Sequence, residues 1–203
     1  MRLRFPLLLL ALAGAAGSVA APAGKGDPAK GAALMNERCA ACHGADGNSA
    51  VPGFPKLAGQ HVEYLLSEFK AYRDKQRQSE VMQPVVEALS EQDALDIAAF
   101  LAKQAPAPGQ VTDPGLLALG KKVYLEGNSD TGVPSCDGCH ETGGEGSARF
   151  PRVAGQNVEY TLEQFRLYAT GKRPYGKKVM RTVAERLTEK EARAVAEYMA
   201  SLP

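Results

Sequence analysis

Two copies of the pattern Cys-x-x-Cys-His carry most of the chemistry that this chain can perform. On a helical turn, residues i, i+3 and i+4 share one face. Both thiols of each copy can therefore bond to the edge of a haem while the histidine turns toward its iron. The pattern is the attachment signature of haem c, and it predicts two covalently attached haem c groups. The residues concerned are Cys39, Cys42 and His43 in "CAACH", and Cys136, Cys139 and His140 in "CDGCH".

Three other uses of paired cysteines fit the sequence less well. A thioredoxin-type redox pair is expected beside a β-α-β pattern, and no stretch of the chain alternates convincingly as a strand. A structural zinc site needs four ligands in one place, whereas the two cysteine pairs lie 97 residues apart, each in its own copy of a longer repeat. Two disulfide-bonded Cys-x-x-Cys loops would leave both histidines without a role.

Each iron needs either a second ligand opposite its histidine or an open position. The candidate side chains are Met35, Met82, Met180, Met199 and His61. Met35 precedes Cys39 by one helical turn, so it cannot easily reach the opposite face of the haem. Met199 falls on an apolar helix stripe, which favours a role in the core. His61 aligns with Asn157, which favours a surface position at the start of a helix.

Met82 and Met180 are the two candidates that recur as a pair. They follow His43 and His140 by 39 and 40 residues, and each precedes the cap of a last helix, Leu-Ser or Leu-Thr, by seven residues. Methionine usually fills gaps in a core, but here it lies among polar residues in an expected loop of both copies. We therefore predict that Met82 and Met180 are the second axial ligands.

A histidine that binds a metal usually donates its other ring N–H to an acceptor. Pro55 follows His43 by 12 residues, and Pro151 follows His140 by 11 residues. The backbone carbonyls of these two prolines are the acceptors that the sequence offers.

These motifs lie in a chain that repeats itself. Residues 54–72, "FPKLAGQHVEYLLSEFKAY", align with residues 150–168, "FPRVAGQNVEYTLEQFRLY", and eleven of the nineteen positions are identical. A repeat of about 97 residues is too long for a solenoid and indicates two duplicated domains. The Pro- and Gly-rich stretch "KQAPAPGQVTDPG" reads as the linker. We place the domains at residues 21–109 and 110–203, behind a signal peptide at residues 1–20.

Each copy is expected to contain three or so helices and no strand. A capping aspartate before a proline, at Asp27 and Asp113, fits the start of a first helix. Ser90 and Thr188, each followed three residues later by an acidic residue, fit the cap of a last helix. The expected second helices cover residues 61–72 and 157–169. The fold class is therefore all-α. Because such small domains have a thin apolar core, we expect a large buried cofactor to stabilise them.

The first twenty residues have the pattern of a secretory signal peptide. Arg2 and Arg4 precede a short apolar run, and small residues follow up to Ala20, the expected cleavage site. The apolar run is too short to span a bilayer comfortably, although a retained membrane anchor is the alternative. We expect an exported, soluble chain. Without Arg2 and Arg4, the 24 basic residues become 22 against 23 acidic ones, which gives no indication of nucleic-acid binding.

The duplicated sequence resembles the dihaem cytochrome c4 family over essentially the whole mature chain. The resemblance rests on "CAACHGADGNS", the two segments of the form FP-[KR]-[LV]-AGQ-x-VEY, both Cys-x-x-Cys-His motifs, and Met82 and Met180 ahead of the last helices. It implies two tandem class I cytochrome c domains related by pseudo-twofold symmetry, each with His/Met ligation. It also implies a bacterial periplasmic carrier that passes single electrons between respiratory partners such as a terminal oxidase. The second motif lacks the "HGADGN" form of the first, which affects the loop after the haem and not the ligands.

Three other functions are the alternatives at this point. One of them, a haem-based sensor, would want an extra signalling segment, which we do not find in the sequence. A dihaem peroxidase would need one open or displaceable iron position, but both copies keep the candidate methionine, so we expect an electron carrier and not an enzyme. A cytochrome subunit bound permanently to a dehydrogenase has the same sequence features as a free carrier. We expect a monomer that binds redox proteins and no nucleic acid, with peripheral membrane contact as an option.

A cluster of basic residues around Met180 is a candidate docking rim for an acidic partner. Long-range attraction between opposite charges speeds the encounter of two proteins. The alternative is a merely solvated lysine-rich loop. The members of the cluster are Lys172, Arg173, Lys177, Lys178 and Arg181.

Overall fold

The computed structural model describes residues 25–174 and 178–203, and within them the only strand-like features are two isolated bridges. The N-terminal half contains α1 (Pro28–Arg38), α2 (Ala40–His43), α3 (Val62–Arg73), α4 (Met82–Glu87) and α5 (Glu91–Leu101). The C-terminal half contains the 3₁₀ turn η1 (Pro114–Leu116), α6 (Leu117–Glu126), α7 (Asp137–His140), α8 (Val158–Ala169), α9 (Lys178–Arg186) and α10 (Glu189–Ser201). The predicted all-α fold is confirmed. The predicted signal peptide, with its cleavage site after Ala20, lies outside the described residues.

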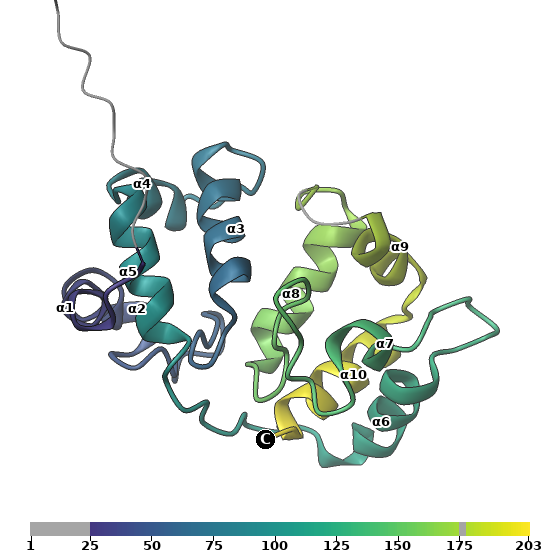
Figure 1. Cartoon of the computed structure of the whole chain (residues 1–203). Coiled ribbons are helices and arrows are strands. Elements are labelled where there is room, and N and C mark those ends of the chain that lie inside the picture. The colour runs from purple at the N-terminus through teal and green to yellow at the C-terminus, as the bar shows by residue number, and fades with distance from the viewer. Residues whose placement is uncertain (1–24, 175–177) are drawn as a thin grey trace, which may run out of the picture.

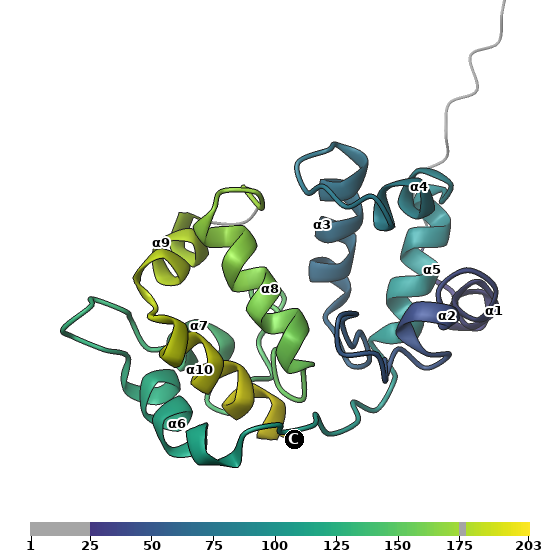
Figure 2. The same ribbon diagram turned by 180° about the vertical axis from the view of Figure 1, so that it is seen from behind.

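The two halves form two helical domains in which the elements follow the same order (Figure 1). In both views, α3 lies on the inner side of one domain and α8 on the inner side of the other (Figures 1 and 2). The segment between α5 and η1 runs along one edge of the molecule. Among residues 25–174 and 178–203, no helix has the length and apolar character that crossing a bilayer requires.

The helix starts follow the predicted caps. The Asp27 carboxylate accepts a hydrogen bond from the backbone N–H of Ala29 at 2.9 Å. Ser90 and Thr188 both form complete capping boxes, in which side chain and backbone satisfy each other. Asp113 caps η1 rather than a full helix, and α6 begins three residues later than the predicted start at Pro114.

Each domain is held together where its first helix crosses its last. α1 packs against α5, and α6 packs against α10. A glycine lies at both crossings: a Cβ atom on Gly31 would lie 2.0 Å from the carbonyl oxygen of Asp96, and one on Gly120 would lie 2.0 Å from that of Ala194. Met35 is fully buried in the core beside the first of these crossings.

The segments that carry Met82 and Met180 are short helices and not the predicted loops. α4 begins at Met82, and Met180 is the third residue of α9. Val86 lies four residues after Met82, Val183 lies three residues after Met180, and both valines are buried. The reason for the difference is that this i, i+3/i+4 spacing gives each methionine an apolar helix face to join, although polar residues surround it in sequence.

The repeated AGQ motif joins the two domains by reciprocal hydrogen bonds. The amide group of Gln60 donates to the carbonyl of Arg152 at 3.0 Å and accepts from its backbone N–H at 2.9 Å. Gln156 makes the same pair of bonds with the backbone of Lys56, at 3.0 and 2.9 Å. Because residues 60 and 156 correspond in the two copies, these bonds have the pseudo-twofold symmetry that the resemblance implied.

His61 lies at the start of α3 as predicted, but it contacts the other domain rather than only solvent. Its Nε2 lies 2.8 Å from the carbonyl oxygen of Glu145. Its counterpart Asn157 donates from its side-chain amide to the carbonyl of Phe54 at 2.8 Å. His61 is half-buried, so it lies at the surface as expected, and in addition it contacts the other domain.

Candidate haem-binding sites

Two short helices position the histidine of each Cys-x-x-Cys-His motif. α2 ends at His43 and α7 ends at His140, and both side chains are buried. The backbone N–H of each histidine donates to the carbonyl of the first cysteine of its motif, Cys39 or Cys136, at 2.9 Å. The predicted helical turn is therefore present in both copies, and it turns the first cysteine and the histidine toward the same side.

The two histidines have the acceptors that the sequence predicted. Nδ1 of His43 lies 3.0 Å from the carbonyl oxygen of Pro55, and Nδ1 of His140 lies 2.9 Å from that of Pro151. Burial lowers the pKa of both imidazoles, and the proline carbonyls oppose this only in part. Each imidazole is therefore neutral at pH 7, donates from Nδ1, and keeps the lone pair of Nε2 for a metal.

The residue before each proline also contacts its histidine. The rings of His43 and Phe54 meet edge to face with centroids 6.2 Å apart, and those of His140 and Phe150 do so at 6.3 Å. The repeated Phe-Pro dipeptide thus supplies both a hydrogen-bond acceptor and an aromatic contact, which together fix the orientation of the imidazole.

The C-terminal motif opens into a cavity of about 730 Å³. All four of the C-terminal residues that the sequence singled out line it, namely Cys136, Cys139, His140 and Met180. Apolar side chains such as Val183 and Met199 form another part of the wall, and the cavity extends to the N-terminal domain at Pro55. The volume and the mainly apolar wall are those of a cofactor site.

The side chains around this cavity fit a haem c. The cysteines form no disulfide bond among the described residues, so their sulfur atoms are available to a haem. Burial raises the pKa of the Cys136 thiol to about 12, which is the opposite of the low thiol pKa of a redox-active pair. Among the described residues, no acceptor lies within hydrogen-bonding distance of the buried Nε–H groups of Arg152 and Arg173, and both arginines line the cavity. A haem c carries two carboxylates, which such donors can bind.

The candidate haem-binding residues of the N-terminal domain lie in elements that correspond to those of the C-terminal domain. Cys39 packs against the core that contains Leu65 and Leu101, and His43 is buried. α4, with Met82 at its first position, packs against α3. Met82 is partly buried, as Met180 is.

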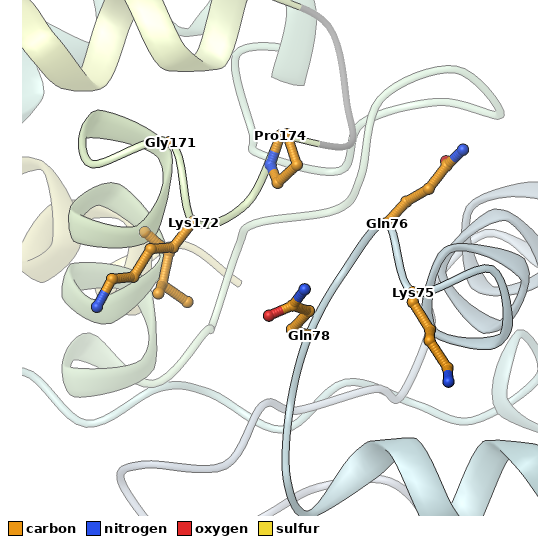
Figure 3. Close-up of a pocket in the computed structure, with 7 residues that line it drawn as sticks. Lys75, Gln76, Gln78, Gly171, Lys172 and Pro174 are labelled. Atoms are coloured by element: carbon orange, nitrogen blue, oxygen red, sulfur yellow. The ribbon is translucent and has the colours of Figure 1, made fainter.

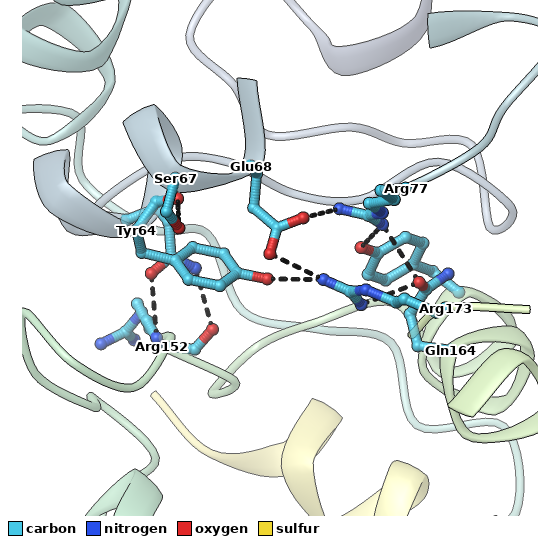
Figure 4. A network of polar contacts seen from close by, with 9 residues as sticks. Tyr64, Ser67, Glu68, Arg77, Arg152, Gln164 and Arg173 are labelled. Atoms are coloured by element: carbon cyan, nitrogen blue, oxygen red, sulfur yellow. Dashed lines mark hydrogen bonds and ion pairs between the residues drawn. The ribbon is translucent and has the colours of Figure 1, made fainter. Parts of the chain in front are cut away.

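A buried polar network joins the domains beside the cavity (Figure 4). The guanidinium group of Arg173 donates to the Glu68 carboxylate at 3.0 Å and to the Gln164 side-chain carbonyl at 2.9 Å. Arg77 donates to the same two side chains, at 2.5 and 3.0 Å. Sequence reasoning missed this role, although Arg77 and Arg173 recur 96 residues apart, as Gln60 and Gln156 do. That recurrence is the signal that could have revealed them.

The network changes the composition of the predicted docking rim. Arg173 is 4% exposed, so it cannot contact a partner protein, and its assignment to the rim is wrong. Arg181 forms an ion pair with Glu185 at 2.7 Å. Lys177 lies outside the described residues, while Lys172 and Lys178 are exposed.

A second cavity, of about 460 Å³, lies between the segments that follow α3 and α8 (Figure 3). Its wall includes Lys75, Gln78, Leu167 and Lys172, and none of the described residues that line it is a cysteine, histidine or methionine. The two lysine side chains extend in different directions and do not converge on one point. The residues around it have no donor set for a haem.

Comparison with known proteins gives the same family for both halves of the chain. The cytochrome c family model matches residues 28–105 and again residues 117–203. Cytochrome c4 of Thiocapsa roseopersicina is 44% identical over 183 residues, which cover 87% of this chain and 93% of that protein. The thiosulfate dehydrogenase electron acceptor of Thiomonas intermedia is 33% identical over 185 residues, covering 87% and 84%.

A solved structure supports the arrangement of the domains as well as the sequence match. The crystal structure of reduced recombinant cytochrome c4 from Pseudomonas stutzeri has a TM-score of 0.82 and 37% identity to this chain, covering 88% of this chain and all of that one. The fold, the paired motifs and these matches agree with one another. The chain belongs to the cytochrome c4 family, whose members carry two covalent haem c groups and transfer electrons rather than catalyse a reaction.

Proposed function

We propose that each haem iron is bound by one histidine and one methionine, His43 with Met82 and His140 with Met180. The thioether bonds are assigned to the cysteines of the two motifs, Cys39, Cys42, Cys136 and Cys139. The observation that carries the proposal is that His140 and Met180 line one cavity while Nδ1 of His140 is held by Pro151. The matching elements of the N-terminal domain support the same assignment for His43 and Met82.

These side chains suit a carrier of single electrons. A bound haem c supplies an iron that accepts and releases one electron. Methionine sulfur favours the ferrous state, so Met82 and Met180 raise the potential into the range of late respiratory transfer. With a histidine and a methionine to hold each iron, an external ligand such as peroxide would find no free position, which would separate this carrier from a dihaem peroxidase.

We also propose that the chain is exported to the bacterial periplasm. The pattern of residues 1–20, with cleavage after Ala20, supports export, as does membership of a family with covalent haem. The proposed boundary between the two domains, at residues 109 and 110, lies between the two regions that the cytochrome c model matches.

The ligand assignment predicts a specific spectroscopic behaviour of the purified holoprotein. We expect two haems per chain, both low-spin in the ferric state, and little binding of carbon monoxide to the reduced protein. Haem content is measured after alkaline pyridine treatment, and ligation by absorption spectra with and without carbon monoxide. A high-spin haem that reacts with peroxide would instead support the peroxidase.

The partners are redox proteins, and we propose a dehydrogenase as electron donor with a terminal oxidase or another respiratory complex as acceptor. The name of the Thiomonas relative, an electron acceptor of thiosulfate dehydrogenase, supports a donor of this class. Docking at the C-terminal domain would use the exposed residues Lys172 and Lys178, on either side of the segment that leads into α9. A permanent complex with such a dehydrogenase would use the same contacts.

The docking proposal predicts a salt-dependent loss of rate in the variant Lys172→Gln/Lys178→Gln. Stopped-flow reduction by a thiosulfate dehydrogenase is expected to slow several-fold at low ionic strength, and the difference should vanish at high salt because exposed charges are screened. The control variant Lys30→Gln/Lys103→Gln removes two exposed lysines from the N-terminal domain and should keep the original rate. An unchanged rate of the first variant at low salt would remove the docking role.

A further inference from the structure

The network between the domains is symmetric in almost every contact. Arg77 donates to the hydroxyl of Tyr160 at 3.0 Å, and its counterpart Arg173 donates to the hydroxyl of Tyr64 at 3.0 Å. Each guanidinium group also lies 4.7 Å from the centroid of a tyrosine ring in its own domain, Tyr72 or Tyr168. All of these pairs are related by the 96-residue offset between the copies.

One pair of corresponding residues in the network differs in charge. Glu68 on α3 corresponds to Gln164 on α8, and each accepts hydrogen bonds from both arginines. Burial alone would raise the pKa of Glu68, but the two guanidinium groups outweigh it and hold the pKa below its usual range. Glu68 is therefore ionised at neutral pH, and the buried network contains two positive charges and one negative charge.

The negative charge lies at the wall of the C-terminal haem cavity. The charged side chains that line this cavity are Lys56, Glu68, Arg149, Arg152 and Arg173. Glu68 is thus the only acidic residue among the lining residues that the structure describes. It comes from the N-terminal domain, so the charge environment of the C-terminal haem depends on a residue of the other domain.

We propose that Glu68 is a tuning residue that lowers the reduction potential of the C-terminal haem relative to its value with a neutral side chain at this position. Oxidation adds one positive charge to a haem iron, and a nearby carboxylate stabilises that added charge in a medium of low dielectric constant. Within the buried network, Glu68 is therefore a difference in charge between two otherwise corresponding sets of residues. The inference rests on the proposed His/Met ligation of both haems.

The variant Glu68→Gln tests this directly. Gln164 already accepts bonds from both arginines at the equivalent position, so glutamine can keep the contacts at position 68. At a fixed solution potential, the ratio of reduced to oxidised C-terminal haem is expected to rise about tenfold, which corresponds to about 59 mV for a one-electron couple. Potentiometric titration followed by absorption measures the shift.

Two further variants control for structure. Gln164→Glu adds a carboxylate to the same network and is expected to lower the potential. The exchange variant Glu68→Gln/Gln164→Glu keeps the total charge and should return the mean potential close to that of the original protein. Thermal unfolding of each variant shows whether the fold is kept. The C-terminal haem is identified by repeating the titration with Met82→Ala, which alters the spectrum of the N-terminal haem alone.

The outcomes separate this inference from the proposed function. An unchanged or lowered potential in Glu68→Gln would overturn the tuning role, and so would an equal shift of both haems. If the original protein lacks two low-spin His/Met haems, the proposed function itself fails, and the ferric spectrum shows this before any variant is titrated.

Discussion

Met180→Ala is expected to remove the sixth ligand of the C-terminal haem and to leave the N-terminal haem unchanged. Alanine has no donor atom, and Met180 is the residue of α9 whose sulfur-bearing side chain lines the cavity with His140. The potential of that haem should fall by several tenths of a volt, within the range of about 0.8 V that axial ligands control. The reduced variant should also bind about one carbon monoxide per chain, because a position at the iron becomes accessible.

Potentiometry and carbon monoxide titration measure both effects, and Met199→Leu is the matched control. Met199 also lines the cavity, but it lies on α10 and corresponds to Leu101 in the N-terminal copy. Leucine should therefore replace it with little change in potential. If Met199→Leu opens the iron to carbon monoxide and Met180→Ala does not, the ligand assignment is wrong.

Gly120→Ala is expected to destabilise the C-terminal domain by about 3 kcal/mol or more, at the upper end of the cost of overpacking. The new Cβ atom would lie 2.0 Å from the carbonyl oxygen of Ala194 and 2.6 Å from its carbonyl carbon. Both atoms are backbone, so the contact is relieved only if α6 and α10 move apart. That movement would loosen the buried packing around Tyr124 and Val195.

Denaturant unfolding of the holoprotein, monitored by circular dichroism, measures the loss. Gly31→Ala is the equivalent change in the N-terminal domain, where the Cβ atom would lie 2.0 Å from the carbonyl oxygen of Asp96, and it should have a similar cost. Gly53→Ala is the control, because a Cβ atom at that position meets nothing within 4 Å. Equal stability of Gly120→Ala and Gly53→Ala would show that the helix crossing can relax.

The content of haem and the identity of its candidate ligands could be predicted because the relevant signals are local or repeated. Cys-x-x-Cys-His places three groups within one helical turn, so its chemistry depends on no distant residue. Met82 and Met180 stood out because the duplication supplies an internal comparison. The helix caps at Ser90 and Thr188 are equally local, and both formed as predicted.

The roles that sequence analysis missed belong to residues whose contacts are distant in the sequence. Arg173 was assigned to an exposed rim, but it is buried and binds the other domain. The contact of His61 with the other domain was also not predicted. Met82 and Met180 were placed in loops because polar neighbours hid the apolar residues three and four positions later.

By itself, the sequence determined how many haems the chain binds, which side chains can hold them, and that two similar helical domains result. The physical reason is that haem attachment and helix capping each depend on residues within one short segment, and the duplication repeats these segments. Only the tertiary structure decided how the domains meet. It brought Glu68 to the wall of a cavity that belongs to the other domain, and it paired the AGQ glutamines with backbone about a hundred residues away. Such contacts arise only when the two domains meet with α3 and α8 on their inner sides, which depends on the whole chain.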